Sequence, residues 1–319
     1  MELIYILVTA TFLDYVIGDP PSWPHPVAYI GKLISWLEVH LRKYGLATKF
    51  GGFILFLLTV LITLGTLTLI LGLSAIGGKI VESIVVIYFL TSALAATCLK
   101  KEVMKVASAL ENGTIEESRI ALSYLVGRDT QTLTHEAIIK GTVETTAENT
   151  IDGVIAPIFY MALGLILDCP VQMVFLYKTI NTLDSMVGYI QEPYTQIGYV
   201  SAKMDDLINL IPARLGSLLM LLSGFILKLD VGQGLRIWKR DCRKHKSPNA
   251  GHPESVVAGL LGIRLGGTHT YFSQVLEKPT IGDSIRKIEV HDIKTTTQIM
   301  YVSEWLLILL SGGLLLLIS

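Results

Sequence analysis

The segment Phe53–Gly78 contains no charged side chain, and this constrains the fold more than any other feature of the sequence. About 20 apolar residues suffice to cross a bilayer as a helix. Inside a bilayer the backbone must satisfy its own hydrogen bonds, which favours helices. The whole chain of 319 residues is 51% hydrophobic and only 17% charged, against about 25% charged residues in soluble domains. The sequence therefore predicts a membrane protein built of helices.

Further apolar runs extend this prediction. Ser83–Leu99 is free of charge and is stopped by Lys100 and Lys101, and the Gly77–Gly78 pair before it predicts a tight turn, so the two runs should form a helical hairpin. We expect spans at about 53–73, 83–99 and 301–318, and a retained N-terminal helix over 1–17. The expected fold class is all-α: a polytopic integral membrane helical bundle forming a single membrane-embedded catalytic domain over residues 1–319.

Two apolar stretches, 153–177 and 211–228, are short for a span, and Pro170 breaks the first of them. The basic residues on either side should be cytoplasmic, so both stretches cross or neither does. We expect short re-entrant or buried helices and catalytic polar loops, including Lys178–Asn209, that face the cytoplasm. Thr280–Thr297 is expected to form an amphipathic helix that leads into the last span.

The charge balance and the cysteines exclude several classes of protein. Lys and Arg number 26 against 27 Asp and Glu, so the chain is not a broadly basic nucleic-acid binder. Its 3 cysteines form no C-x-x-C pair and no even framework, so neither a zinc site nor a disulfide scaffold is predicted. The bilayer is the expected partner, and the sequence leaves the oligomeric state open.

The first polar cluster recurs every four residues, which places its members on one helical face: Glu136, Lys140, Glu144, Glu148 and Asp152. Glu136 and Lys140, or Lys140 and Glu144, are spaced to pair. The remaining carboxylates border an apolar segment and predict a Mg²⁺ site or a hydrogen-bonded catalytic cleft. The alternative is a solvated face held by salt bridges between neighbouring turns.

Two more clusters combine amides, carboxylates and cations. The first shares a helical face and contains residue types that hold a phosphate and its metal: Lys178, Asn181, Asp184 and Ser185. The second resembles Asp-rich motifs that bind Mg²⁺-diphosphate on helices, with Arg214 following: Asp205, Asp206 and Asn209. For the second cluster the alternative is a helix cap in which the two carboxylates oppose Arg214.

A basic loop precedes a helix of small residues and offers Lys, Ser, Asn and His donors to an anion: Lys246, Ser247, Asn249 and His252. No G-x-x-x-x-G-K-[ST] sequence occurs, so this loop is not a Walker A loop. The alternative is a juxtamembrane polybasic loop that binds acidic lipid.

Six motifs in order resemble the CobD/CbiB family, the adenosylcobinamide-phosphate synthases of cobalamin biosynthesis. They are Gly18-Asp-Pro with His25-Pro-Val, Lys140-Gly-Thr-Val-Glu-Thr with Ala147-Glu-Asn-Thr-Ile-Asp-Gly, Asn181-Thr-Leu-Asp-Ser-Met-Val-Gly-Tyr, Asp205-Asp-Leu-Ile-Asn-Leu-Ile-Pro-Ala-Arg, Ser247-Pro-Asn-Ala-Gly-His-Pro-Glu-Ser and Arg264-Leu-Gly-Gly. The resemblance covers nearly the whole chain. The short link Gly164–Pro170 departs from it, because glycines are commoner there in the family.

The resemblance implies an integral membrane ligase. Such an enzyme joins the propionate carboxylate of (adenosyl)cobyric acid, a corrinoid, to aminopropanol or aminopropanol phosphate, and uses ATP and Mg²⁺. A carboxylate is a poor acyl donor, so phosphorylation of it would create a leaving group for attack by the amine.

The chemistry of that reaction, rather than the resemblance, assigns roles to the clustered residues. We expect Mg²⁺ ligands at Glu148, Asp152, Asp205, Asp206 and Asn209. Cations at Lys140, Lys178 and Arg214 would balance phosphate charge, while the amine phosphate or the nucleotide would contact Asn181, Asp184, Ser185, Lys246, Ser247, Asn249 and His252. Glu144 or His252 would accept the amine proton.

Two other hypotheses remain. The Asp205-Asp206-x-x-Asn209 pattern is also compatible with an intramembrane prenyltransferase-like enzyme, which would need a second motif of the same kind. A transporter or sensor is the alternative of another class, although no internal repeat of the type seen in transport folds is visible.

Overall fold

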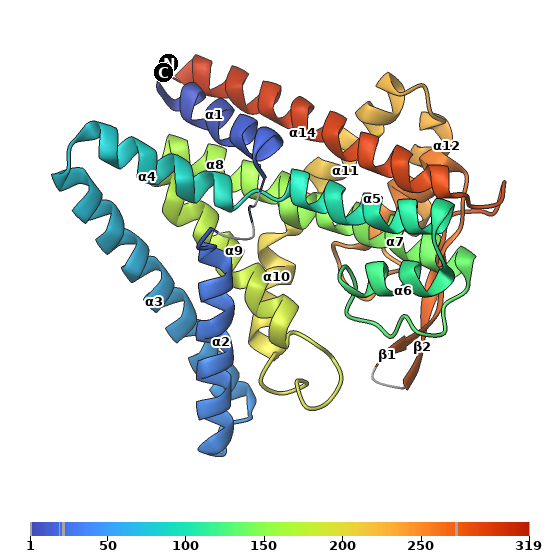
Figure 1. Cartoon of the computed structure of the whole chain (residues 1–319), viewed down its shortest axis with the longest axis horizontal. Coiled ribbons are helices and arrows are strands. Elements are labelled where there is room, and N and C mark those ends of the chain that lie inside the picture. The colour runs from blue at the N-terminus through green and yellow to red at the C-terminus, as the bar shows by residue number, and fades with distance from the viewer. Residues whose placement is uncertain (1, 19, 21–22, 272–273, 319) are drawn as a thin grey trace. The chain divides into compact units, whose positions relative to one another are not determined.

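The computed structural model describes residues 2–18, 20, 23–271 and 274–318, which are mostly helical (Figure 1). The chain divides into two compact units: unit 1 comprises Met1–Ala95, Ala156–Asn209 and Ile308–Ser319, and unit 2 comprises Ala96–Ile155 and Leu210–Leu307.

Unit 1 contains α1 (Glu2–Val16), α2 (Pro26–Lys43), α3 (Lys49–Ile76), α4 (Lys79–Ser92), α8 (Ala156–Ile166), α9 (Pro170–Val187), α10 (Tyr199–Ile208) and the end of α14 (Val290–Ile318). Unit 2 contains α5 (Ala96–Asn112), α6 (Ile115–Ser123), α7 (His135–Thr150), a π-helical turn (Ile151–Ile155), α11 (Leu210–Ile226), α12 (Val231–Asp241), α13 (Gly251–Leu261), β1 (Leu265–Tyr271), β2 (Gln274–Ile281) and the first part of α14.

The predicted hairpin of α3 and α4 is confirmed, since the two helices contact each other. Thr48 starts α3 because its hydroxyl accepts the N–H of Gly51 at 3.2 Å. Gly77 ends α3, and Gly78 adopts φ 91°, a conformation that favours glycine. Large apolar side chains along α3 are exposed, among them Leu61 and Leu69.

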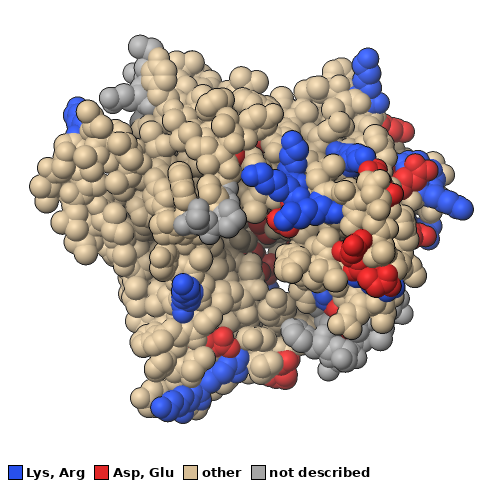
Figure 2. All heavy atoms as spheres, viewed as in Figure 1, with Lys and Arg blue, Asp and Glu red and all other residues tan. Residues whose placement is uncertain are grey.

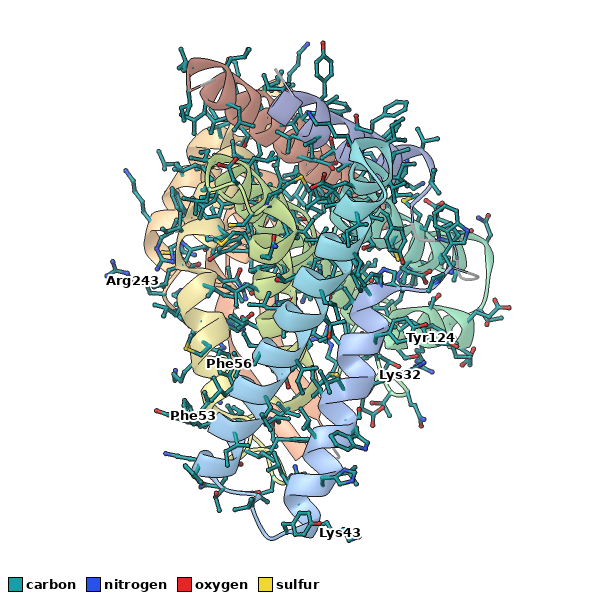
Figure 3. All side chains as sticks on the ribbon, turned by 90° about the vertical axis from the view of Figure 1, so that its left-hand side faces the viewer. Lys32, Lys43, Phe53, Phe56, Tyr124 and Arg243 are labelled. Atoms are coloured by element: carbon teal, nitrogen blue, oxygen red, sulfur yellow. The ribbon has the colours of Figure 1, made fainter. Side chains whose placement is uncertain are left out.

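The surface over α3 and α4 is nearly free of charge on the face drawn in Figure 2. Figure 3 shows α3, with Phe53 and Phe56, beside α2, with Lys32 and Lys43. An uncharged surface of this kind is typical of helices that face lipid.

A second hairpin in unit 1 joins α8 to α9. Pro170 breaks the helix between the two apolar pieces as predicted, since α8 ends at Ile166 and Pro170 stands at the first position of α9. Asp168 turns the chain with φ 57°. A side chain at Gly164 would come within 2.6 Å of the Cα of Pro170, so only glycine permits this close packing of the turn against α8.

In unit 2, α13 is buried along its length and packs on α12. The two helices approach closely at a pair of glycines, where a side chain at Gly259 would lie 2.7 Å from the Cα of Gly234. Antiparallel β1 and β2 follow, with Leu265 opposite Ile281 and a bulge between Leu265 and Gly267.

The expected amphipathic helix over Thr280–Thr297 is wrong in its first half. β2 continues to Ile281, and the chain then turns at Gly282, whose φ is 83°. The N–H of Gly282 donates to Asp241 Oδ2 at 2.8 Å, which holds this turn. Helix α14 begins only at Val290, where Asp292 accepts the N–H of Glu289.

Among the described residues, four helical runs are long and apolar enough to cross a membrane: Lys49–Ile76, Lys79–Asn112, His135–Ile166 and Val290–Ile318. A fifth is counted if α10 and α11 form one interrupted span. The N-terminal helix α1 is shorter, and its apolar part covers Ile4–Val16. The stretch that begins at Gly153 was expected to be a short helix. It instead forms the end of the continuous helical run His135–Ile166, because the π-helical turn joins α7 to α8.

Candidate functional site

In unit 1, α9 and α10 bring together three of the residues that the sequence singled out. Asn181 donates from its side-chain amide to Asp205 Oδ1 at 3.2 Å, and Asn209 donates to Asp205 Oδ2 at 3.1 Å. The side-chain amides of Asn181 and Asn209 thus orient both carboxylate oxygens of Asp205. A carboxylate held in this way can accept a cation or a second donor.

Two tyrosines that the sequence analysis missed support this cluster. Tyr177 donates to Asn209 Oδ1 at 3.2 Å, which fixes the amide so that its NH₂ group faces Asp205. The rings of Tyr160 and Tyr177 stack 5.1 Å apart, and Tyr160 donates to the carbonyl of Ile208. A tyrosine within an apolar run is the signal that could have found them, because a buried phenol needs a hydrogen-bond partner.

The other predicted residues of unit 1 do not all join this cluster. Asp206 points to Lys203, at 3.0 Å, because consecutive residues on a helix face directions about 100° apart. Ser185 is exposed and donates to the carbonyl of Asn181. Lys178 and Asp184 are half-buried on α9, where Asp184 lies against Gly188 so closely that any side chain there would clash.

In unit 2, Glu144 forms a buried ion pair that the sequence analysis missed. Arg128 donates to Glu144 Oε2 at 3.2 Å, with side-chain exposures of only 4% and 7%. Glu144 Oε1 accepts the N–H of Gly266 at 2.7 Å, so this carboxylate also ties α7 to the start of β1. Gly141 makes room for the pair, since a side chain there would meet the Arg128 guanidinium at 2.0 Å.

The rest of the α7 cluster spreads along one helix. Lys140 pairs with Glu136 at 2.8 Å, which confirms the first of the two pairings considered. Glu148 is half-buried one turn after Glu144. Asp152 lies in the π-helical turn, and a turn of that kind shifts the side chains that follow it out of the regular α-helical register.

The basic loop before α13 forms a compact turn. Ser247 Oγ accepts the N–H groups of Asn249 and Ala250 at 3.2 and 3.3 Å. Arg214, from α11, donates to Asn249 Oδ1 at 3.2 Å and brings its cation to this loop. Lys246 is exposed beside them. Arg214 therefore joins Ser247 and Asn249, whereas the sequence analysis had placed it with the Asp205 motif.

His252 lies on α13 next to this loop and is 7% exposed. Its Nδ1 accepts the indole N–H of Trp238 at 3.0 Å, a contact that the sequence analysis missed. Burial first, and then the positive charges of Arg214 and Arg243, lower the pKa of His252 to about 4. The imidazole of His252 is therefore neutral near pH 7. The side chain of Arg243, one of the two cations that act on it, projects from the surface (Figure 3).

No group of three or more His, Cys, Asp and Glu side chains among the described residues gathers as a metal centre by itself. Mg²⁺ usually retains several waters and takes one or two protein carboxylates together with substrate phosphates. The amide-held Asp205 fits a ligand set of that kind. Glu148, Asp152 and Asn209 remain predictions as metal ligands, and Asp206, which pairs with Lys203, is left out of the proposed ligand set.

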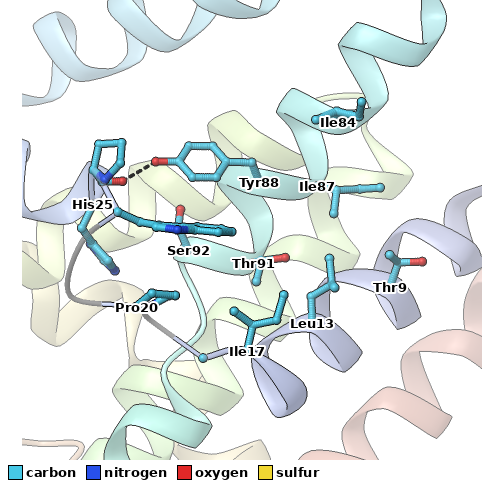
Figure 4. Close-up of a pocket in the computed structure, with 13 residues that line it drawn as sticks. Thr9, Leu13, Ile17, Pro20, His25, Ile84, Ile87, Tyr88, Thr91 and Ser92 are labelled. Carbon is cyan, nitrogen blue, oxygen red and sulfur yellow. Dashed lines mark hydrogen bonds between the residues drawn. The ribbon is translucent and has the colours of Figure 1, made fainter.

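The N-terminal motif lines an apolar groove of about 380 Å³ in unit 1, between α1, α4 and the segment that enters α2 (Figure 4). Gly18, Pro20 and His25 lie on its wall, and Tyr88 donates to the carbonyl of Pro24 there. Asp19 lies outside the described residues. Trp23 and Tyr88 give the groove an aromatic wall. No carboxylate lines it among the described residues.

Comparisons with known proteins support the family resemblance. The family model described as CobD/Cbib protein matches residues 7–300. Relatives named cobalamin biosynthesis protein CobD include one from Listeria monocytogenes strain EGD-e, 44% identical over 99% of this chain and 100% of its own length. Those from Clostridium perfringens and Klebsiella pneumoniae are each 45% identical, over 94% and 95% of both chains respectively.

No solved structure matches the chain. The match of the family model spans far more than half of the sequence, and the relatives align from end to end with identities well above 30%. The chain belongs to the CobD/CbiB family.

Proposed function

We propose that the chain is an amide-forming enzyme of cobalamin biosynthesis. It would join the propionate carboxylate of cobyric acid to aminopropanol or its O-phosphate, with ATP and Mg²⁺. The observation that carries the proposal is the end-to-end similarity to relatives named cobalamin biosynthesis protein CobD. This similarity favours the reaction over a prenyltransferase-like enzyme or a transporter.

The carboxylate must first become an acyl donor. Mg²⁺-ATP, when bound, would supply a phosphoryl group to a carboxylate oxygen and leave as ADP. The amine would then attack the acyl carbon while phosphate leaves. Such reactions depend on positioning and on neutralisation of phosphate charge.

In unit 1, Asp205 is the proposed Mg²⁺ ligand. Asn181 and Asn209 donate to its two oxygens, and Tyr177 holds the amide of Asn209. Lys178, Asp184 and Ser185 are proposed nucleotide contacts on α9. Asn209 therefore orients Asp205, in addition to its predicted role as a ligand.

In unit 2, the proposal assigns an anion to the loop before α13. Arg214 and Lys246 would supply positive charge, while Ser247, Asn249 and His252 would supply hydrogen bonds. Lys140 would balance phosphate charge from α7.

The amine must lose a proton as the amide forms, and two residues are candidates for accepting it. The Nδ1 lone pair of His252 is already used by Trp238. Each oxygen of Glu144 keeps a second lone pair beside its bond to Arg128 or Gly266. Glu144 is therefore our candidate proton acceptor.

A pair of variants tests the proposed function: Asp205→Asn and Asp206→Asn in purified, detergent-solubilised protein. With cobyric acid, amine and Mg²⁺-ATP, the wild type should form a product heavier than the acid by the mass of the amine less water. Asp205→Asn should lower this rate at least about 100-fold, because the oriented carboxylate is lost. Asp206→Asn should stay within about 3-fold, because that residue pairs with exposed Lys203. Equal effects of the two substitutions would remove the metal assignment, and no product from the wild type would remove the reaction.

A further inference from the structure

Trp238 lies outside every motif of the sequence analysis, yet it makes a specific bond to one of the motif residues. It stands on α12, and its indole N–H donates to Nδ1 of His252 on α13 at 3.0 Å, with ring centroids 6.0 Å apart and planes inclined by 69°. The glycine contact between Gly234 and Gly259 brings these two helices close enough for the bond.

The chemistry of the two rings fixes where the histidine carries its proton. An indole nitrogen only donates, so Nδ1 of His252 must present a lone pair to it. A neutral imidazole carries one proton, which must then be on Nε2. The cations Arg214 and Arg243 and the burial of the ring disfavour a second proton.

A ring in this state donates through Nε2 and has no remaining lone pair with which to accept a proton. It lies beside the loop in which Arg214 reaches Asn249 and Ser247 caps two backbone N–H groups. Donors and cations together favour an anionic oxygen as the ligand.

We propose that Trp238 is a positioning residue that holds His252 as an Nε2–H donor to a phosphate oxygen of the substrate bound at this loop. His252 is then an anion-binding residue rather than the general base. The inference rests on the proposed function for the identity of the substrate, while the tautomer that it requires is independent of any reaction.

The first arm of the test needs no substrate. In full-length protein labelled with ¹⁵N-histidine, wild-type His252 should show a protonated Nε2 and an unprotonated Nδ1 near pH 7. In Trp238→Phe, which keeps a ring in the same place, the two nitrogens should approach an averaged pattern. Addition of inorganic phosphate should shift the Nε2 signal of the wild type. An unchanged tautomer in Trp238→Phe, or no response to phosphate, would overturn the proposal.

The second arm measures kinetics. Trp238→Phe should raise the KM for the phosphorylated amine about 5- to 10-fold while kcat stays within about 2-fold, because a bond that orients one donor is lost. The KM for ATP distinguishes the two sources of phosphate: a rise there instead would place the nucleotide at the loop. Trp36→Phe, at an exposed tryptophan of α2, is the matched control and should match the wild type.

Substitution of the histidine itself separates a donor from a base. His252→Gln retains an N–H near the position of Nε2, so it should keep substantially more activity than His252→Ala. Equal inactivity of the two variants would contradict the donor role. If the wild type makes no amide at all, the proposed function fails, and the ¹⁵N signals still decide whether Trp238 sets the tautomer.

Discussion

At the scale of single residues, the hydrogen-bond partners of each candidate carboxylate determine its electrostatic surroundings. Asp205 and Asn209 lie one turn apart at the end of α10, and Asn181 on α9 faces Asp205, so the three side chains lie together. Glu144 was equally visible, but Arg128 was not, because it precedes α7 across a loop whose course no periodicity describes. The sequence therefore identified the candidate carboxylates without showing which of them are neutralised.

The buried pair of Arg128 and Glu144 gives a prediction about stability. Glu144→Gln should lower the free energy of unfolding in detergent by about 3–5 kcal/mol, because it removes one partner of a buried ion pair. The double variant Arg128→Gln/Glu144→Gln should cost less than the sum of the two single variants, since both charges of the pair are then absent. Denaturant titration of the four proteins measures this coupling.

The control is the exposed pair on the same helix. Glu136→Gln, which breaks the bond to Lys140, should change the free energy of unfolding by no more than about 0.5 kcal/mol.

The double variant Arg128→Gln/Glu144→Gln also tests the chemistry: a folded protein without the Glu144 carboxylate should form no amide. Normal activity in it would exclude Glu144 as the proton acceptor.

At the scale of elements, the helices were predictable and the connection after β2 was not. Apolar runs and Gly–Gly or Pro signals located α3, α4 and α9. The turn at Gly282 depends on Asp241, 41 residues earlier, and a pattern in the local sequence cannot show such a bond. The same dependence explains why an amphipathic helix was expected where β2 ends.

Asp241 is the buried acceptor that joins α12 to this turn. It is fully buried and accepts from Arg240 at 2.7 Å, from Lys244 at 2.6 Å and from the N–H of Gly282 at 2.8 Å. Burial alone would raise the pKa of Asp241, but the hydrogen bonds from Arg240, Lys244 and Gly282 outweigh it and hold the pKa well below its ordinary value.

The sign of the pH dependence follows from that direction. A carboxyl group with a lowered folded-state pKa stabilises the fold above its ordinary pKa of about 3.9, and this contribution is lost as the pH falls towards the folded-state value. Asp241→Asn should therefore lower the free energy of unfolding by about 1–3 kcal/mol at pH 7, the cations being partly exposed. Between pH 7 and pH 3 the difference from the wild type should shrink.

Asp283→Asn is the matched control, because Asp283 binds Arg236 and Arg240 from a partly exposed position. It should cost no more than about 1 kcal/mol. A difference between wild type and Asp241→Asn that grows as the pH falls would contradict the assigned pKa direction.

At the scale of the whole molecule, composition was enough to predict a membrane protein but not its division into two compact units. The long apolar runs are visible one by one. Unit 1, however, is assembled from three separate parts of the chain and unit 2 from two, so the boundaries follow from contacts between distant segments. The sequence shows neither a linker nor a change of composition at the boundaries Ile155 and Asn209.

Membrane orientation gives the last prediction. Cations before α3 and after α4 favour a cytoplasmic position for both ends of this hairpin, which would place its Gly77–Gly78 turn outside. If ATP is a substrate, the segment Lys178–Asn209 must be reached from the cytoplasm. In a background with Cys98, Cys169 and Cys242 replaced by Ser, Lys79→Cys should react with a membrane-impermeant maleimide added to intact cells.

Cysteines at Gln191 and Gln196, in the connection between α9 and α10, should react only after the cells are permeabilised. Gln196 is exposed, so a failure to label it from outside reflects the bilayer and not burial in the protein. Arg243→Cys, at an exposed position of the basic loop, serves as the cytoplasmic reference and should behave as Gln196→Cys does. If Gln196→Cys labelled from outside together with Lys79→Cys, the Asp205 cluster would be on the side without ATP, and the nucleotide would have to be removed from the proposed reaction.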